Sequence, residues 1–446
     1  MTWRARGRLA ALALAGAALL VGAVEAGLRV AGVSPADPRA SAELGPGWVR
    51  DRDARLGPWL VELREDGVVP RVRLDPAHAA LGMRAQSFSL ERRPEEIRLF
   101  ALGGAATALP PDAPGDAWPQ QFQDLLRARD ASHRWAVVGL GLRGLDTREM
   151  AVQAREAIAV GAQGLLVLPG EDDLGAALID RITASTPSSW LDRSRVLRLL
   201  RRWAQPRDAA RPHGPLDRDA LERDLVARLV LAAQASDQAL RPAAGRELEP
   251  LYAGMLADLR AGLTELAAAA ASAGVPVWLG IPPLDPWIPP LLGVADPDLD
   301  PDARLKATEA VQQARALFEQ GDPEAAAGRV ARALAHDPSH AEACWMGGLL
   351  AWADGDDARA RELLVRAADR DLRSRRIDGP RREVLRAVCT SHPEVHCLDL
   401  DAAFAPDGGL PPEDLFTESG LPSPEGGMPL IAGAFGEAVL MGAGLR

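Results

Sequence analysis

Lysine and tyrosine are almost absent from this 446-residue chain, in which Lys306 is the only lysine and Tyr252 the only tyrosine. No basic run with interleaved aromatic side chains occurs, and the net charge is −11. Because nucleic acids and anionic membrane surfaces bind basic patches, we exclude both as partners of the main body. Hydrophobic residues make up 47% and charged residues 25%, as in an ordinary globular protein. The length predicts about two or three structural units.

Cysteine is also scarce, and its three examples are Cys344, Cys389 and Cys397. Their spacing fits neither a zinc site nor a redox motif. Two interpretations stay open for the pair that brackets residues 390–396. The two thiols form a disulfide if the compartment is oxidising, or they are two buried small hydrophobic side chains.

Long apolar runs are limited to the N-terminus, where arginines within residues 1–8 precede an apolar stretch over 9–24. A positive segment followed by an apolar one is typical of a signal sequence, and 24–26 is a poor cleavage site. We therefore predict an uncleaved signal anchor over 1–30; a cleaved signal peptide and an ordinary buried helix are the alternatives. The anchor predicts a single-pass protein of the inner (cytoplasmic) membrane, with its main body on the periplasmic or extracytoplasmic side.

Short apolar runs alternate with helical patterns after residue 94, whereas residues 31–94 are predicted to be an irregular lead-in. Runs of strand length lie at 97–102, 135–138, 164–168, 275–281 and 395–400, and helical patterns lie at 118–126, 148–160 and 251–273. Buried strands that alternate with helices predict a parallel sheet covered on both faces. Ligands of such sheets bind beyond the carboxyl ends of the strands, so we expect any chemistry in the loops there.

A 34-residue repeat lies between the fourth and fifth of these runs. Aligning 307–340 with 341–374 superimposes small or apolar residues: Gly321 on Gly355, Ala326 on Ala360, Val330 on Leu364, Ala333 on Ala367 and Ala314 on Gly348. This period is typical of the tetratricopeptide repeat, a helix–turn–helix unit; a plain helical hairpin is the alternative. We predict a helical insertion over 301–374 that binds a protein partner, within a sheet domain formed by 95–300 and 375–446.

Segments in a consistent order carry a resemblance to a known family. They are Gly82–Phe88, Arg98–Gly104, Pro282–Trp287, Arg370–Arg376 and Asp414–Gly426. Together they resemble the SGNH (GDSL-type) hydrolases, in the branch that carries tetratricopeptide repeats, over most of 46–430. The resemblance implies a three-layer, flavodoxin-like α/β domain. It also implies hydrolysis or transfer of esters by a Ser, an Asp and a His, with a Gly, an Asn and backbone amides at the oxyanion.

The chain departs from this pattern at the first two motifs. Ala105 stands where the family has its serine after the glycine pair, and a methyl group cannot attack a carbonyl. The next hydroxyl is that of Thr107, which we predict to cap the following turn. In the second motif Gly139 replaces the asparagine, whereas Gly141 is retained.

The last two motifs are altered as well. Gly170 is retained, but Asp172 stands where the family has the oxyanion asparagine. An ionised carboxylate only accepts hydrogen bonds, so it repels developing negative charge. Glu418 and Leu421 stand where the family has its Asp and His, and leucine cannot act as a general base. These losses predict a pseudoenzyme.

Three functions stay open, and no cofactor is expected for any of them. The favoured one is a membrane-anchored binding or scaffold protein whose degenerate cleft, lined by Gly104 and Thr107, has a glycan or an acyl group as candidate ligand. The second is an active ester hydrolase or acyltransferase with relocated chemistry. In it, carboxylates such as Glu171 and Asp173 do acid–base work or bind Ca²⁺ or Mg²⁺. The third is a docking module in which only the repeats matter.

Overall fold

The computed structural model describes most of the chain after residue 85. The described ranges are 86–108, 117–173, 240–290, 298–371, 377–418 and 420–442, with short strands at 48–49, 60–63 and 71–74 and single positions at 177, 293 and 296. The anchor predicted over 1–30 lies outside them. Within these ranges, no helix is both long enough and apolar enough to span a membrane.

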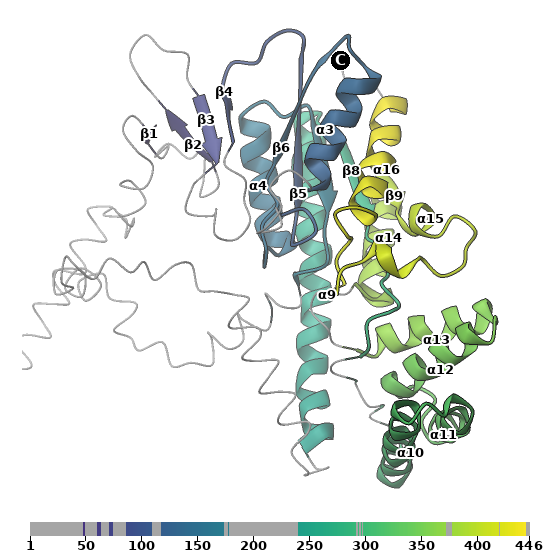
Figure 1. Cartoon of the computed structure of the whole chain (residues 1–446). Coiled ribbons are helices and arrows are strands. Elements are labelled where there is room, and N and C mark those ends of the chain that lie inside the picture. Colours follow the sequence, from purple (N-terminus) through teal and green to yellow (C-terminus); the bar gives the residue numbers. More distant parts are fainter. Residues whose placement is uncertain are drawn as a thin grey trace, which may run out of the picture.

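A five-stranded parallel sheet forms the centre of the described chain (Figure 1). In spatial order its strands are β6 (Arg134–Gly139), β5 (Glu96–Gly103), β7 (Gly164–Leu168), β8 (Val277–Ile281) and β9 (Val395–Asp399). Each neighbouring pair is parallel, which confirms the predicted α/β architecture. The chain passes from β5 to β6 on one side and then to β7 on the other. The loops that follow β5 and β7 therefore meet at a topological switch point.

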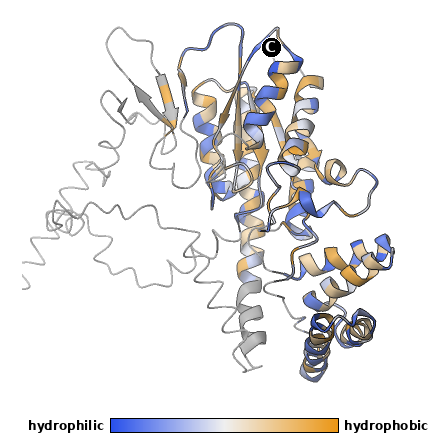
Figure 2. Ribbon diagram, viewed as in Figure 1, coloured by the Kyte–Doolittle hydropathy of each residue, from blue (hydrophilic) through white to orange (hydrophobic). Residues whose placement is uncertain are grey.

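Helices cover both faces of this sheet. On one face lie α4 (Thr147–Ala159), α9 (Leu240–Ala273) and α14 (Gly379–Ser391), and on the other lie α3 (Trp118–Arg129), α15 (Asp401–Phe404) and α16 (Gly427–Met441). Successive side chains of a strand point to opposite faces, so Phe100 belongs to the first core and Leu99 to the second. Figure 2 shows the strands as mostly apolar, between helices that carry both apolar and polar stretches.

The lead-in is more ordered than predicted. It contributes β1 (Trp48–Val49), β2 (Leu60–Leu63), β3 (Arg71–Leu74) and β4 (Ser87–Ser89), which form a four-stranded antiparallel sheet. Strands of two to four residues give too few positions for alternation to stand out in the sequence. The prediction of a wholly irregular segment was therefore wrong for these residues.

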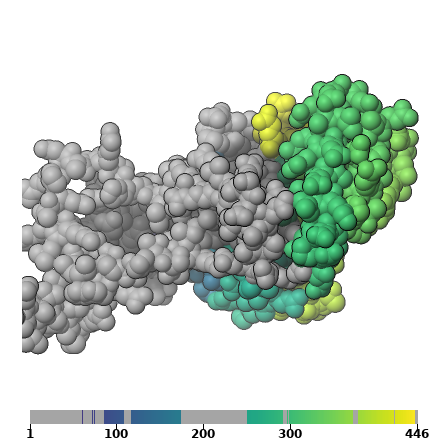
Figure 3. Space-filling view, turned by 90° about the horizontal axis from the view of Figure 1, so that it is seen from below, coloured from purple at the N-terminus to yellow at the C-terminus, as the bar shows by residue number. Residues whose placement is uncertain are grey.

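Two helical pairs occupy the region of the 34-residue period. They are α10 (Pro301–Glu319) with α11 (Pro323–His336), and α12 (Ala341–Ala353) with α13 (Asp357–Asp369). The turns of both pairs are alike, because Gly321 and Gly355 have φ of 77° and 79° and Asp322 and Asp356 cap the following helices. In Figure 1 the two pairs lie at the lower right, below the sheet and its helices, and in Figure 3 they are the green part of the surface.

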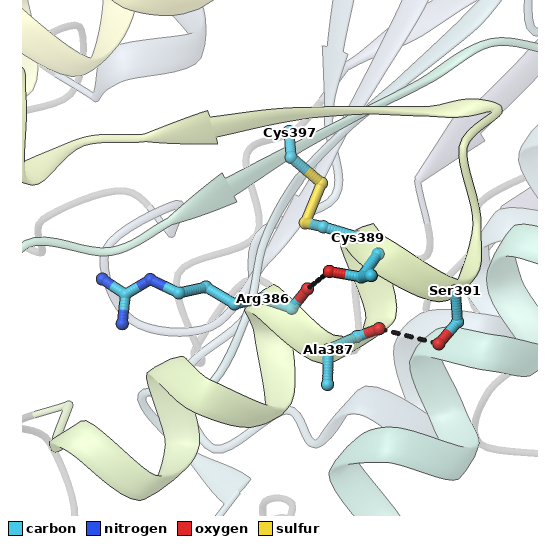
Figure 4. The surroundings of a disulfide bond; sticks show 6 residues. Arg386, Ala387, Cys389, Ser391 and Cys397 are labelled. Atoms are coloured by element: carbon cyan, nitrogen blue, oxygen red, sulfur yellow. Dashed lines mark hydrogen bonds between the residues drawn. A yellow bond between two sulfur atoms is a disulfide. The ribbon is translucent and has the colours of Figure 1, made fainter.

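A disulfide joins Cys389 of α14 to Cys397 of β9, as Figure 4 shows. The sequence left open a disulfide or two buried thiols, and the structure contains the disulfide. Its loop is short, with a sequence separation of 8, and it ties a helix of one face to the outermost strand of the sheet. Cys344 is the free cysteine among the described residues, and it is buried in α12.

Candidate functional site

The loop after β5 forms the first wall of the candidate site. It turns tightly, since the N–H groups of Thr107 and Ala108 both donate to the carbonyl of Gly104 at 3.1 and 3.0 Å. Gly104 leaves room for the Asp172 carboxylate, because a Cβ there would lie 2.4 Å from one of its oxygens and would displace it. Ala105, which the sequence resemblance predicts to replace a nucleophilic serine, is only 6% exposed. At positions 105 and 106 the turn therefore offers backbone N–H groups and methyl side chains.

The loop after β7 supplies three consecutive carboxyl groups. Gly170 turns the chain with φ of 101°, which disfavours any side chain with a Cβ. Glu171, Asp172 and Asp173 follow, and they are 3%, 4% and 4% exposed. Acidic side chains are rarely buried to this degree unless they are paired or hydrogen-bonded. The hydrogen-bond partners of these three carboxyl groups therefore show which segments the loop holds together.

All three carboxyl groups accept hydrogen bonds from neighbouring turns. Asp172 accepts from the N–H of Ala105 at 2.7 Å, and Glu171 accepts from the N–H of Ala106 at 2.9 Å. Asp173 accepts from both the N–H and the hydroxyl of Thr147, at 3.0 and 2.8 Å. The acidic loop thus ties the loop after β5 to the start of α4.

A buried arginine from α14 lies under the acidic loop. Arg381 is fully buried and donates to the carbonyl of Gly170 at 2.9 Å. It also forms an ion pair with Asp378, the N-cap of α14, at 3.0 Å. Its guanidinium charge acts on Glu171 and Asp173 as well, in the direction that favours their ionised forms. Sequence reasoning did not single out Arg381, because the segment around it has no motif of its own.

Burial outweighs this attraction for two of the carboxyl groups. Burial, and then the charge of Asp172, raise the pKa of Glu171 to about 8. Burial also raises the pKa of Asp173 to about 6, against the hydrogen bonds from Thr147. At neutral pH Glu171 therefore keeps its proton, and the site carries less negative charge than its sequence indicates.

Thr107 is fixed as a hydrogen-bond acceptor. Thr107 is 3% exposed, and its hydroxyl accepts from the indole N–H of Trp118 at 3.3 Å. Its backbone lies against Gly141, where a Cβ would be 2.3 Å from the Thr107 carbonyl carbon. Gly139 is different, because a Cβ there would meet nothing closer than 3.9 Å. Gly141 is thus the glycine that allows the backbone after β6 to approach the backbone of Thr107.

The closing segment contributes apolar packing. Leu421 is half-buried and packs against the hydrophobic cluster that contains Ala106 and Phe435, whereas Glu418 is exposed. A turn holds the segment together, since the Thr417 N–H donates to the Leu421 carbonyl at 2.8 Å. Leu421 therefore contributes apolar packing at the margin of this cluster.

In chemical terms the described residues of these loops supply buried acids and backbone N–H groups. Within the described ranges, no group of three or more His, Cys, Asp or Glu side chains is placed to hold a metal ion. The structure brings together Gly104, Ala105, Glu171, Asp172 and Asp173, as predicted for loops at the carboxyl ends of neighbouring strands. It adds Thr147, which immediately precedes the helix predicted over 148–160 and is the first residue of α4.

No family model matches the chain, and no curated protein sequence matches it. Among solved structures, the crystal structure of LAE5, an alpha/beta hydrolase enzyme from the metagenome of Lake Arreo, Spain, aligns with a TM-score of 0.33 and 12% identity. The alignment covers 78% of this chain and 96% of that one. A similarity this low establishes neither family nor activity.

Proposed function

We propose that this chain is a catalytically inactive relative of the SGNH hydrolases that acts as a binding or scaffold protein. One observation carries the proposal. The N–H groups of Ala105 and Ala106, at the position of the family's nucleophile, are already bound by the carboxyl groups of Asp172 and Glu171. An ester hydrolase needs those donors free, because they stabilise the oxyanion of the transition state.

The cost to catalysis can be bounded. Losing one oxyanion donor costs about 3–4 kcal/mol of transition-state stabilisation, or roughly 10²–10³ in rate. Here two amides are engaged, Ala105 supplies no nucleophile, and Leu421 supplies no base. The missing groups act as a unit, so restoring any one of them would recover little.

The binding role belongs to the helical pairs rather than to the former cleft. Gly104, Ala105 and the three acids are all buried, which argues against a glycan or an acyl group between them. We propose that α10–α13 are two tetratricopeptide repeats that hold a protein partner. The equal turns at Gly321 and Gly355 support this, as does Gly348, where a Cβ would clash with Leu364 at 2.5 Å.

The proposed location is the outer side of the inner membrane, with residues 1–30 as a single anchor. The apolar stretch over 9–24 and its preceding arginines support the anchor. The disulfide between Cys389 and Cys397 supports the placement of the main body outside the cytosol. Such bonds persist in oxidising compartments and are rare in the cytosol.

A second candidate is hydrolysis with relocated acid–base chemistry. The observation that favours it is the raised pKa of Glu171, because perturbed carboxyl groups are common in active sites. Against it stand the 3% exposure of Glu171 and its hydrogen bond from Ala106.

One assay separates the two candidates. The purified full-length chain is tested for turnover of a short-chain aryl ester and for labelling by a fluorophosphonate, beside an active serine esterase. The scaffold proposal expects no turnover above buffer and no label. Turnover that Glu171→Gln abolishes would support the relocated chemistry instead.

Partner binding needs its own test. A photo-crosslinking residue is placed at the exposed Gln312 of α10 and, as a matched control, at the exposed Glu437 of α16. The repeat proposal expects a discrete crosslinked species from the first position alone. Crosslinks of equal yield from both positions would contradict it.

A further inference from the structure

The junction between α13 and α14 contains a recess that the proposed scaffold role does not use. Its volume is about 620 Å³, and its walls are Pro338, Ser339, Arg366, Asp369, Arg370 and Pro380. Cavities that hold small molecules usually have about 300–1,000 Å³. The recess takes residues from the turn between α11 and α12, from the end of α13 and from the start of α14.

Two guanidinium groups lie one helical turn apart on the wall that α13 provides. Arg366 is held in place, because it donates to Glu362 at 2.6 Å and to the carbonyl of Pro338 at 3.4 Å. Arg370 is half-buried, and within the described part of the chain its side chain has no hydrogen-bond or ion-pair partner. Arg370 therefore carries an uncompensated positive charge with free donors.

The acidic wall of the recess is already engaged elsewhere. Asp369 accepts a hydrogen bond from the N–H of Gly379 at 2.6 Å, at the N-terminus of α14. The partial positive charge of a helix N-terminus attracts a carboxylate, so Asp369 is balanced there. Glu362, in turn, is shared between Arg366 and Arg359. The guanidinium of Arg370 is thus left to face the recess unbalanced.

We propose that this recess binds a small molecule through an oxyanion group, a phosphate or a carboxylate. Arginine presents a planar set of donors that matches both groups and often binds them through two parallel hydrogen bonds. Arg370 supplies the primary contact, and Arg366, already held in position, supplies the second. Pro338 and Pro380 form apolar walls for the remainder of the ligand. The site is independent of the loops that follow β5 and β7.

The test uses the full-length chain and simple anions. Thermal unfolding is followed while inorganic phosphate, or in a parallel series acetate, replaces chloride at constant ionic strength. A bound anion raises the midpoint of unfolding by mass action, and the two series distinguish phosphate from carboxylate. Arg370→Gln is expected to weaken the apparent affinity by ~10-fold or more, the usual effect of losing a charged hydrogen bond.

Two further variants make the result specific. Arg366→Gln should weaken binding less than Arg370→Gln, and it serves as the second test if the Arg370 variant does not fold. Arg332→Gln removes an exposed guanidinium on α11, outside the recess, and should respond to anions as the unchanged protein does. The proposal is overturned if neither anion shifts the midpoint, or if the three variants and the unchanged protein respond alike.

Discussion

The N–H of Ala105 donates to the Asp172 carboxylate at 2.7 Å, across 67 residues of sequence. In the proposed relationship to the SGNH hydrolases, Ala105 replaces the nucleophile and Asp172 replaces the oxyanion asparagine. A carboxylate bound to this amide occupies the donor that a substrate oxyanion would use. Its negative charge also repels a negatively charged oxygen at the same place. Under that proposal, the two replacements act together, because the carboxylate of one binds the amide of the other.

This contact predicts the result of restoring the nucleophile. Ala105→Ser should show no turnover of an aryl ester above buffer, because the neighbouring amides stay bound and Leu421 cannot accept the serine proton. The measurement is ester hydrolysis with an active serine esterase in parallel. Clear turnover by the variant would show that the carboxyl groups leave the amides and that another base serves the site.

The two glycines of the second motif should tolerate a methyl group differently. Gly141→Ala puts a Cβ 2.3 Å from the backbone of Thr107, which cannot move without disturbing the loop after β5. Overpacking of this kind costs about 1–3 kcal/mol in the free energy of unfolding. Gly139→Ala is the matched control, with its nearest neighbour at 3.9 Å, and it should change stability by less than ~1 kcal/mol. Urea denaturation measures the free energy of unfolding of both variants. Equal losses would contradict the close packing of Gly141 against Thr107.

The strands and the 34-residue period could be predicted because they depend on local pattern. The run that became β7 is apolar throughout, and all of its residues are buried. The recurring glycines at 321 and 355 mark turns that the backbone adopts only with positive φ. Periodicity and turn chemistry act within a few residues, so they can be read along the chain.

The contacts of the candidate site could not be predicted in this way. Arg381 reaches Gly170 across 211 residues, and nothing in the residues around either one specifies the other. The sequence indicated that Asp172 lies at the altered cleft, but not that it binds the amide of Ala105. Long-range pairing of this kind is decided by the packing of α14 and the sheet, which local propensity does not determine.

Removal of the disulfide should destabilise the chain moderately. Bridging a loop with a sequence separation of 8 restricts the unfolded state by about 2–3 kcal/mol in the chain-entropy treatment. Cys389→Ser with Cys397→Ser should lower the free energy of unfolding by that amount, whereas a reductant should not affect the double variant further. A thiol count on the denatured, unreduced protein should find one thiol, that of Cys344. Three thiols would exclude the bridge.

The raised pKa of Glu171 predicts how stability depends on pH. Its ordinary value is 4.5 and its folded value is about 8, so between these limits the folded chain holds a proton that the unfolded chain has lost. The free energy of unfolding should therefore fall as the pH rises through this window, by up to ~1.4 kcal/mol per pH unit. Asp173 acts in the same direction, but only up to about pH 6.

Urea denaturation between about pH 6.5 and 8 therefore isolates Glu171, since this window lies above the range of Asp173. Glu171→Gln keeps an acceptor for the N–H of Ala106 but cannot ionise, so its stability should lose most of that slope and exceed the unchanged protein's at the upper end. Glu383→Gln, which alters an exposed carboxyl group on α14, should keep the slope. If the slope is the same in all three proteins, Glu171 is ionised throughout. The hydrogen bond from the N–H of Ala106 would then go to a carboxylate ion rather than to a neutral acid.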